Sequence, residues 1–133
     1  MTDSRYAKNV GAVFSLKYHV VWCPKYRRAV LAHPVDRRLK ALLNEIANEY
    51  GMTIHTAEVM PDHVHLFVEA DPTLCVAEMV NRFKGRTSRV LRQEFKQLRT
   101  RLPTLWSRSY FAGTVGAVSE ATIRRYIEAQ KGR

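Results

Sequence analysis

Apolar and polar residues alternate along residues 14–23, close to the start of the chain. Because successive side chains of a β-strand point to opposite faces, this pattern predicts a strand with one buried and one polar face. Lys17 and His19 fall on the polar face. Pro24 ends the segment, since proline has no N–H to donate to a sheet. The apolar residues at every second position are Phe14, Leu16, Tyr18, Val20 and Trp22.

A second alternating pattern lies at residues 63–70 and is the sharpest in the chain. His63 and His65 point to one side of this predicted strand, and the apolar residues that alternate with them point to the other. Residues 52–60 predict a further strand. Only a two-residue turn separates these two strands, so we expect them to be antiparallel neighbours.

Apolar residues recur every three or four positions along residues 34–50 and 76–98, which predicts two amphipathic helices. The second pattern keeps its period across Gly85, which is a candidate position for a bend because glycine weakens a helix interior. Residues 110–115 predict a final strand. A last helix then follows Ser119, whose hydroxyl can accept from the free N–H groups of a first helical turn.

The predicted order of elements is therefore β-α-β-β-α-β followed by a helix. This order is typical of the ferredoxin-like, or RRM-like, arrangement. We predict one α+β domain over residues 1–133, with an antiparallel sheet covered by two helices on one face and an additional C-terminal helix. The other face of the sheet is open to a site, and His63 and His65 point to it.

The charge balance favours a polyanionic partner. The chain has 22 lysines and arginines against 12 acidic residues, which gives a formal net charge of +10. A basic surface on a small domain is typical of nucleic-acid binding. Ribosome association or an anionic membrane surface are the alternatives that composition leaves open.

Two cysteines and the hydropathy of the chain indicate its compartment. Cys23 and Cys75 lie far apart and neither has a CxxC partner, so we predict that both are reduced and buried. No segment approaches the roughly 20 apolar residues of a membrane span. The first residues have no signal-peptide pattern. We therefore predict a cytoplasmic protein without a membrane partner.

His63 and His65 are candidate metal ligands. They are two residues apart on a predicted strand, so both imidazoles project from the same side and can hold one metal ion between them. The alternative is a pair of hydrogen-bonded surface histidines. Asp62, directly before them, can stabilise the turn or support the metal ligands from behind, and we expect the turn role.

Tyr126 and Gln130 are four residues apart on the last helix and share a face of it. A tyrosine hydroxyl attacks a phosphodiester poorly, but a divalent metal on the phosphate neutralises charge and aligns the phosphorus. The Gln130 carbonyl oxygen is within reach of the position where Tyr126 points and can act as a third ligand. The alternative is an amphipathic tyrosine at the edge of the core.

Five segments together resemble a known family. Residues 60–68 contain the His-hydrophobic-His pattern of the HUH signature and resemble single-tyrosine transposases of small bacterial and archaeal insertion sequences, with REP-associated tyrosine transposases as close relatives. Four other segments resemble that family in the same order along the chain. Ala117 departs from the pattern, which has a polar residue such as Asn there. The four segments are residues 18–27, 83–88, 105–111 and 114–130.

The resemblance implies a DNA transposase with a catalytic C-terminal helix. In this reading Tyr126 attacks single-stranded DNA at a hairpin-flanked element end and forms a 5′-phosphotyrosine. His63, His65 and Gln130 bind Mg²⁺ or Mn²⁺, although two imidazoles favour softer metals, so the preferred metal stays open. The enzyme would act as a homodimer. Whether Tyr126 acts on its own subunit or on the partner is also open.

Basic residues on two elements are candidate DNA contacts. Lys17 and His19 share the open sheet face with the histidine pair, so we predict that they contact DNA. Arg82, Arg86 and Arg89 follow helical spacing, and such a stripe can track a phosphate backbone. The alternative is a solvated helix face.

Two other functions fit part of the pattern. A metal-independent RNA- or single-stranded-DNA-binding module of RRM-like fold would stack bases on exposed aromatics, and Phe67 is the candidate in the central strands. A metal-dependent hydrolase that uses activated water would cleave DNA without a contribution from Tyr126.

Overall fold

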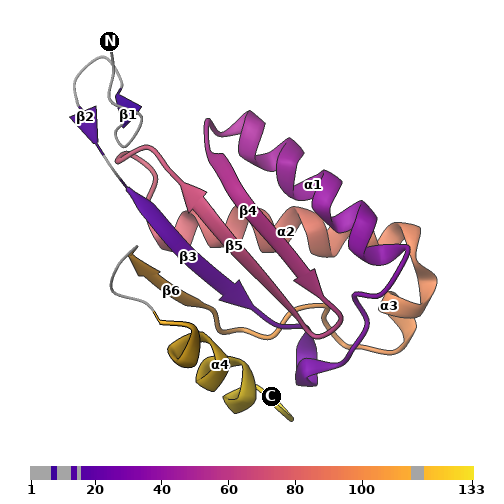
Figure 1. The fold of residues 1–133 in the computed structure, drawn as a ribbon. Helices are drawn as coiled ribbons and strands as arrows, with labels where there is room; N and C mark the ends of the chain where they lie inside the picture. The colour runs from indigo at the N-terminus through magenta and orange to yellow at the C-terminus, as the bar shows by residue number, and fades with distance from the viewer. Residues whose placement is uncertain (1–6, 9–12, 15, 115–118) are drawn as a thin grey trace.

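The computed structural model describes residues 7–8, 13–14, 16–114 and 119–133. Val115 and Ala117 lie outside these residues. The main elements follow the predicted order (Figure 1). They are β3 (Lys17–Trp22), α1 (Val35–Glu49), β4 (Thr53–Met60), β5 (His63–Glu69), α2 (Val76–Glu94), α3 (Lys96–Thr100), β6 (Phe111–Thr114) and α4 (Glu120–Ala129). A short 3-10 helix η1 (Lys25–Arg27) follows β3.

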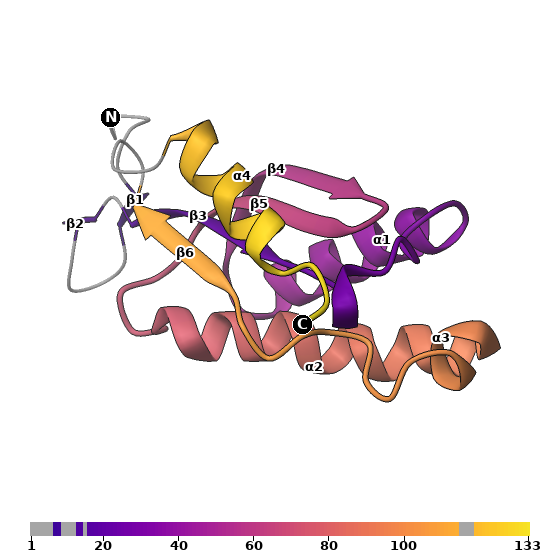
Figure 2. The same ribbon diagram turned by 90° about the horizontal axis from the view of Figure 1, so that it is seen from below.

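Four strands form one antiparallel sheet in the order β4-β5-β3-β6. This order confirms the predicted ferredoxin-like α+β fold, including the antiparallel pairing of β4 and β5. Helices α1 and α2 cover one face of the sheet, and α4 lies on the opposite side (Figure 2). Strands β5 and β3 are central, so residues on their open face lie near the middle of the sheet.

The core lies between the sheet and helices α1 and α2. Val64, Leu66 and Val68 of β5 are fully buried there, whereas the residues that alternate with them are partly exposed. The Trp22 ring stacks on Phe83 of α2 at a centroid distance of 6.1 Å. The alternation in the sequence therefore predicts the two faces of β5 correctly.

Two predicted boundaries differ from the structure. The segment predicted as one strand from residue 14 is divided: β2 (Val13–Phe14) pairs with β1 (Ala7–Lys8) in a separate small sheet, and β3 begins at Lys17. Helix α2 continues through Gly85, where a Cβ would meet nothing within 4 Å, but it ends at Glu94 and not near the predicted residue 98. The chain leaves the helix at Phe95, whose extended backbone accompanies packing of its side chain against the core.

The cysteine prediction is half correct. Cys23 is fully buried, and burial raises the pKa of its thiol to about 11. Cys75 is exposed, contrary to prediction, because it occupies the N-cap position of α2 at the surface. Neither is in a disulfide. Among the described residues, no helix combines the length and hydrophobicity needed to cross a membrane.

Candidate functional site

His63 is held in one orientation by its neighbour. Its Nδ1 lies 2.8 Å from Oδ1 of Asp62, and the side chain is 19% exposed. A carboxylate can only accept, so Nδ1 carries a proton, and in the neutral tautomer with this contact the lone pair is on Nε2. We predicted that Asp62 stabilises the turn, but its carboxylate orients His63, as carboxylates behind metal-binding histidines commonly do.

Arg27 connects this turn to helix α4. Its Nε lies 3.4 Å from Oδ2 of Asp62, and its Nη1 lies 3.4 Å from Oε1 of Glu128 and donates to the Ile127 carbonyl oxygen at 3.3 Å. The Arg27 side chain is 17% exposed. The backbone of Arg27 is left-handed, with φ of 52°, a conformation that costs a non-glycine residue about 1 kcal/mol. No pattern in the sequence predicts these partners of Arg27.

His65 is paired with His19 across the sheet. Nε2 of His65 lies 3.0 Å from Nδ1 of His19, and Nδ1 of His65 lies 3.6 Å from Oε2 of Glu58. Burial, followed by the charge of His19, lowers the pKa of His65, while Glu58 acts in the opposite direction. His65 is therefore neutral at neutral pH, which is the form that binds a metal. His19 lies on the open face next to the pair, where we predicted it.

A cavity of about 630 Å³ lies between these histidines and one face of α4. Its sheet side presents His63 and His65, and Ile123 and Ile127 contribute from the helix. Ile123 and Val21 are both buried but lie outside the core beneath α1 and α2. The C-terminal helix therefore covers part of the face that we expected to be open. The remaining lining residues are His19, Glu58, Asp62, Glu120, Arg124 and Glu128.

Tyr126 and Gln130 lie together, but they do not line this cavity. The Tyr126 hydroxyl lies 2.7 Å from Oγ of Ser109, which donates to Oε1 of Gln130 at 3.0 Å. The Tyr126 ring lies 5.9 Å from that of Phe111 on β6. Burial raises the pKa of Tyr126, and the hydrogen bond with Ser109 lowers it. Gln130 is only 4% exposed.

The donor set fits a metal at the histidine pair only in part. Both imidazoles are on the same face, and Nε2 of His63 is available, but Gln130 of the same chain is turned toward Ser109. Within the described residues, no group of three or more His, Cys, Asp or Glu side chains is placed to hold a metal ion. The predicted nucleophile and third ligand therefore form one cluster, and the histidine pair forms another.

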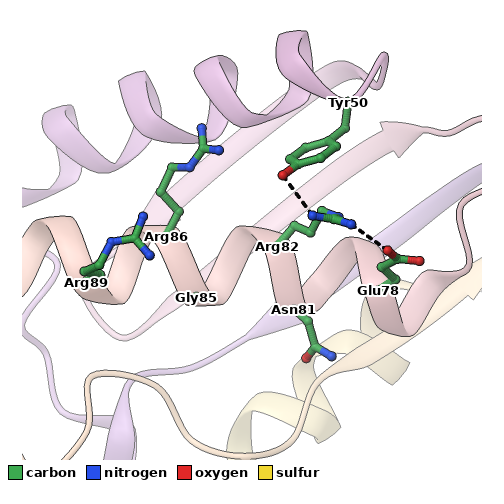
Figure 3. Close-up of a pocket in the computed structure, with 7 residues that line it drawn as sticks. All are labelled: Tyr50, Glu78, Asn81, Arg82, Gly85, Arg86 and Arg89. Carbon is green, nitrogen blue, oxygen red and sulfur yellow. Dashed lines mark hydrogen bonds and ion pairs between the residues drawn. The ribbon is translucent and has the colours of Figure 1, made fainter.

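The predicted arginine stripe lies on α2, on the side of the sheet away from the histidines. Arg82, Arg86 and Arg89 line a shallow groove of about 470 Å³ that also contains Tyr50 at the end of α1 (Figure 3). Arg82 donates to the Tyr50 hydroxyl at 2.8 Å and to Glu78 at 2.7 Å.

The three arginines differ in how much charge they leave for a ligand. Arg86 forms an ion pair with Glu49. Arg89 has no hydrogen bond or ion pair with the residues that the structure describes. Lys17 also lies apart from the histidines, at the far end of β3, where it is opposite Glu69 in the strand register. The structure thus brings His19 to the histidine pair, but neither Lys17 nor the arginines.

Sequence comparison places the chain among the transposases. The family model described as "Transposase IS200 like" matches residues 12–130. The ISDra2 transposase TnpA of Deinococcus radiodurans is 41% identical over 125 residues, which cover 92% of this chain and 89% of that protein. The transposase for insertion sequence element IS200 of Salmonella typhimurium is 31% identical over 119 residues, or 88% of this chain and 78% of that protein. The chain therefore belongs to the IS200-like, or Y1, transposase family.

Solved structures have the same fold. A crystal structure of a Deinococcus radiodurans R1 protein assigned to the transposases superposes with a TM-score of 0.89 at 36% identity, over 96% of this chain and 99% of that one. A REP-associated tyrosine transposase, solved bound to a REP hairpin, gives a TM-score of 0.57 at 13% identity, over 96% of this chain and 69% of that one. The first supports family and fold, and the second supports the fold alone. The resemblance inferred from the motifs is confirmed.

Proposed function

We propose that this chain is a metal-dependent endonuclease and strand transferase for single-stranded DNA, with Tyr126 as its nucleophile and residues 1–133 acting as one domain. One observation carries the proposal: His63, whose Nδ1 contacts Asp62, lines a cavity that is covered by the helix that bears Tyr126. Membership of the transposase family supports it.

The proposed ligands for Mg²⁺ or Mn²⁺ are His63, His65 and Gln130. When bound, the metal would neutralise charge on the scissile phosphate and stabilise the leaving oxygen. Asp62 fixes the ring of His63, and Arg27 fixes Asp62. His65 would exchange its contact with His19 for the ligand position, and His19 would then be free to contact DNA.

Tyr126 supplies the covalent step. Its hydroxyl oxygen forms a bond to phosphorus, the bond from phosphorus to the 3′-oxygen breaks, and the products are a 5′-phosphotyrosine and a free 3′-hydroxyl. The phosphotyrosine linkage is itself a phosphodiester, so a second DNA end can attack it and rejoin the strand without ATP. Because burial raises the pKa of Tyr126, the hydroxyl keeps its proton at neutral pH until it is positioned for attack.

We further propose that the enzyme works as a homodimer on hairpin-flanked single-stranded DNA. Tyr126 and Gln130 do not line the cavity at the histidines of their own chain. Two arrangements would bring them to a histidine pair: α4 moves within its own chain, or α4 of one copy docks at the histidines of a second copy. The REP-associated relative was solved with a hairpin, and the net charge of +10 favours a DNA partner. Proposed DNA contacts are Lys17, His19, Arg82, Arg86 and Arg89.

A binding module that stacks bases on its sheet is less favoured. Its candidate platform, Phe67, is flanked by imidazoles: the ring of His19 lies 5.1 Å away and that of His55 lies 5.2 Å away. Phe67 is therefore not openly available for a base.

The proposal is tested with end-labelled single-stranded DNA that carries a flanking hairpin, incubated with Mg²⁺, Mn²⁺ or EDTA. We expect a protein–DNA adduct on a denaturing gel that needs the metal, disappears in Tyr126→Phe and is lost or greatly reduced in His63→Ala. Cleavage without an adduct, retained in Tyr126→Phe, would indicate a water-activating hydrolase. Binding without cleavage or adduct across several hairpins would refute the enzyme.

A further inference from the structure

Ser109 contacts both groups that the proposed reaction requires from α4. Its Oγ lies 2.7 Å from the Tyr126 hydroxyl and 3.0 Å from Oε1 of Gln130. A serine hydroxyl has one proton, and an amide carbonyl oxygen can only accept. The Ser109 proton therefore goes to Gln130, and Tyr126 must donate its own proton to Ser109. One side chain thus engages the nucleophilic oxygen and the proposed metal-binding oxygen together.

The backbone at Ser109 is held by helix α2 and not by α4. Lys84 of α2 donates from Nζ to the carbonyl oxygens of Ser107 and Ser109, at 2.6 and 3.2 Å. The residues preceding β6 are therefore tied to a helix of the core. If α4 moves, Ser109 stays behind.

We propose that Ser109 is a positioning residue that holds Tyr126 and Gln130 in a resting arrangement, which must open before they can reach a metal and DNA. This inference rests on the proposed function for its consequence in catalysis. Its physical basis is a competition: while Oε1 of Gln130 accepts from Ser109, it is turned away from the histidine cavity, and Tyr126 is turned away with it.

Removing the hydroxyl should favour the open arrangement. One hydrogen bond of this kind corresponds to roughly a fivefold change in population, and Ser109 takes part in two. We therefore expect Ser109→Ala to form the DNA adduct ~5- to 20-fold faster at saturating DNA, with unchanged affinity for the hairpin. The metal concentration that gives half-maximal rate should fall by a similar factor, because Gln130 no longer has to leave Ser109.

Two variants control for structural effects. Ser109→Thr keeps the hydroxyl, and the position is exposed enough for the added methyl group. This variant should form the DNA adduct at the wild-type rate. Ser119→Ala removes the N-cap hydroxyl that accepts from the Thr122 N–H, so it weakens the same helix without contacting Tyr126 or Gln130. It should not lower the metal requirement. A Ser109→Ala enzyme that is slower than wild type, or equal to it in rate and metal requirement, would overturn the proposal.

A measurement without DNA or metal separates this inference from the proposed function. With 3-fluorotyrosine incorporated at position 126, Ser109→Ala should shift and narrow the fluorine resonance toward that of a free side chain, and Ser109→Thr should not. This result is expected even if no adduct is ever found. An unchanged resonance in Ser109→Ala would overturn the resting arrangement whatever the activity.

Discussion

Substitution of Arg27 tests how strongly its contacts stabilise the docking of α4 on the rest of the chain. The side chain is mostly buried and joins Asp62 to Glu128 and the Ile127 carbonyl oxygen. Arg27→Ala removes two ion pairs, worth about 0.2–1 kcal/mol each when partly exposed. It also removes a charged hydrogen bond to one of the last carbonyls of α4, worth about 1 kcal/mol or more. We expect a loss of ~2 kcal/mol in the free energy of unfolding.

The backbone at this position adds a second comparison. Alanine at φ of 52° keeps the left-handed strain of the native arginine, whereas glycine relieves about 1 kcal/mol of it. Arg27→Gly should therefore be less destabilising than Arg27→Ala, although glycine loses more conformational freedom on folding. This order is the reverse of that expected in a helix interior, where glycine costs more than alanine.

Urea unfolding followed by circular dichroism measures both effects. For a chain of this length, 2 kcal/mol corresponds to a fall of roughly 6–8 °C in Tm. Arg124→Ala is the matched control, because its ion pair with Glu120 lies on the same helix but the arginine side chain is 72% exposed. That variant should stay within about 0.5 kcal/mol of wild type. If Arg27→Ala is no less stable than Arg124→Ala, the contacts of Arg27 with Asp62 and with α4 contribute nothing to the free energy of unfolding, and the reasoning is wrong.

Two further predictions concern the other side of the sheet. The buried Thr87 hydroxyl donates to the Phe83 carbonyl oxygen at 2.6 Å and accepts from Nε1 of Trp106 at 3.0 Å. Thr87→Val leaves the indole N–H unpaired and should lower the free energy of unfolding by about 1–3 kcal/mol. Thr87→Ser keeps the hydroxyl and should lower it by less in the same urea titration, and equal losses would contradict this account. Burial lowers the pKa of Lys84 to about 8, so the native state releases this proton before the unfolded state does. The contribution of Lys84 to stability should therefore rise as pH increases from 8 toward 9, while Cys23, whose pKa is raised to about 11, acts in the opposite direction mainly above pH 9. Lys84→Met should lack that rise in urea midpoints measured at the two pH values, and an identical slope in wild type and variant would assign the effect elsewhere.

Local patterns in the sequence were sufficient for the sheet and for the histidine pair. The alternation of residues 63–70 predicts which side chains of β5 face the core because the strand repeat is set by the backbone alone. Boundaries decided by tertiary packing were not predictable in this way. Helix α2 continues through Gly85, whereas Phe95, which has no helix-breaking composition, leaves the helix and packs against the core.

The candidate site shows the same division. Spacing and the resemblance to a family made candidates of four residues, but neither predicted how they are grouped in space. The four are His63, His65, Tyr126 and Gln130. Ser109 is an exposed serine 17 residues before Tyr126, and only the fold brings its hydroxyl to that side chain. The alternation of residues 14–23 puts Val21 on the same face as Lys17 and His19, yet Val21 is buried outside the main core, because the docking position of α4 is a long-range property.

The length of α4 has a consequence for how Tyr126, the proposed nucleophile, can change position. The helix has ten residues, fewer than the ~12–15 that an isolated helix needs to be even marginally stable in water. Its helical order therefore depends on the surface against which it is docked. If Tyr126 moves between two positions as proposed, the helix would be docked in both of them, and an uncoiled segment would be the costly state between them. A surface on which α4 docks therefore has two effects: it contacts the Tyr126 side chain, and it stabilises the helical conformation of the segment that carries Tyr126.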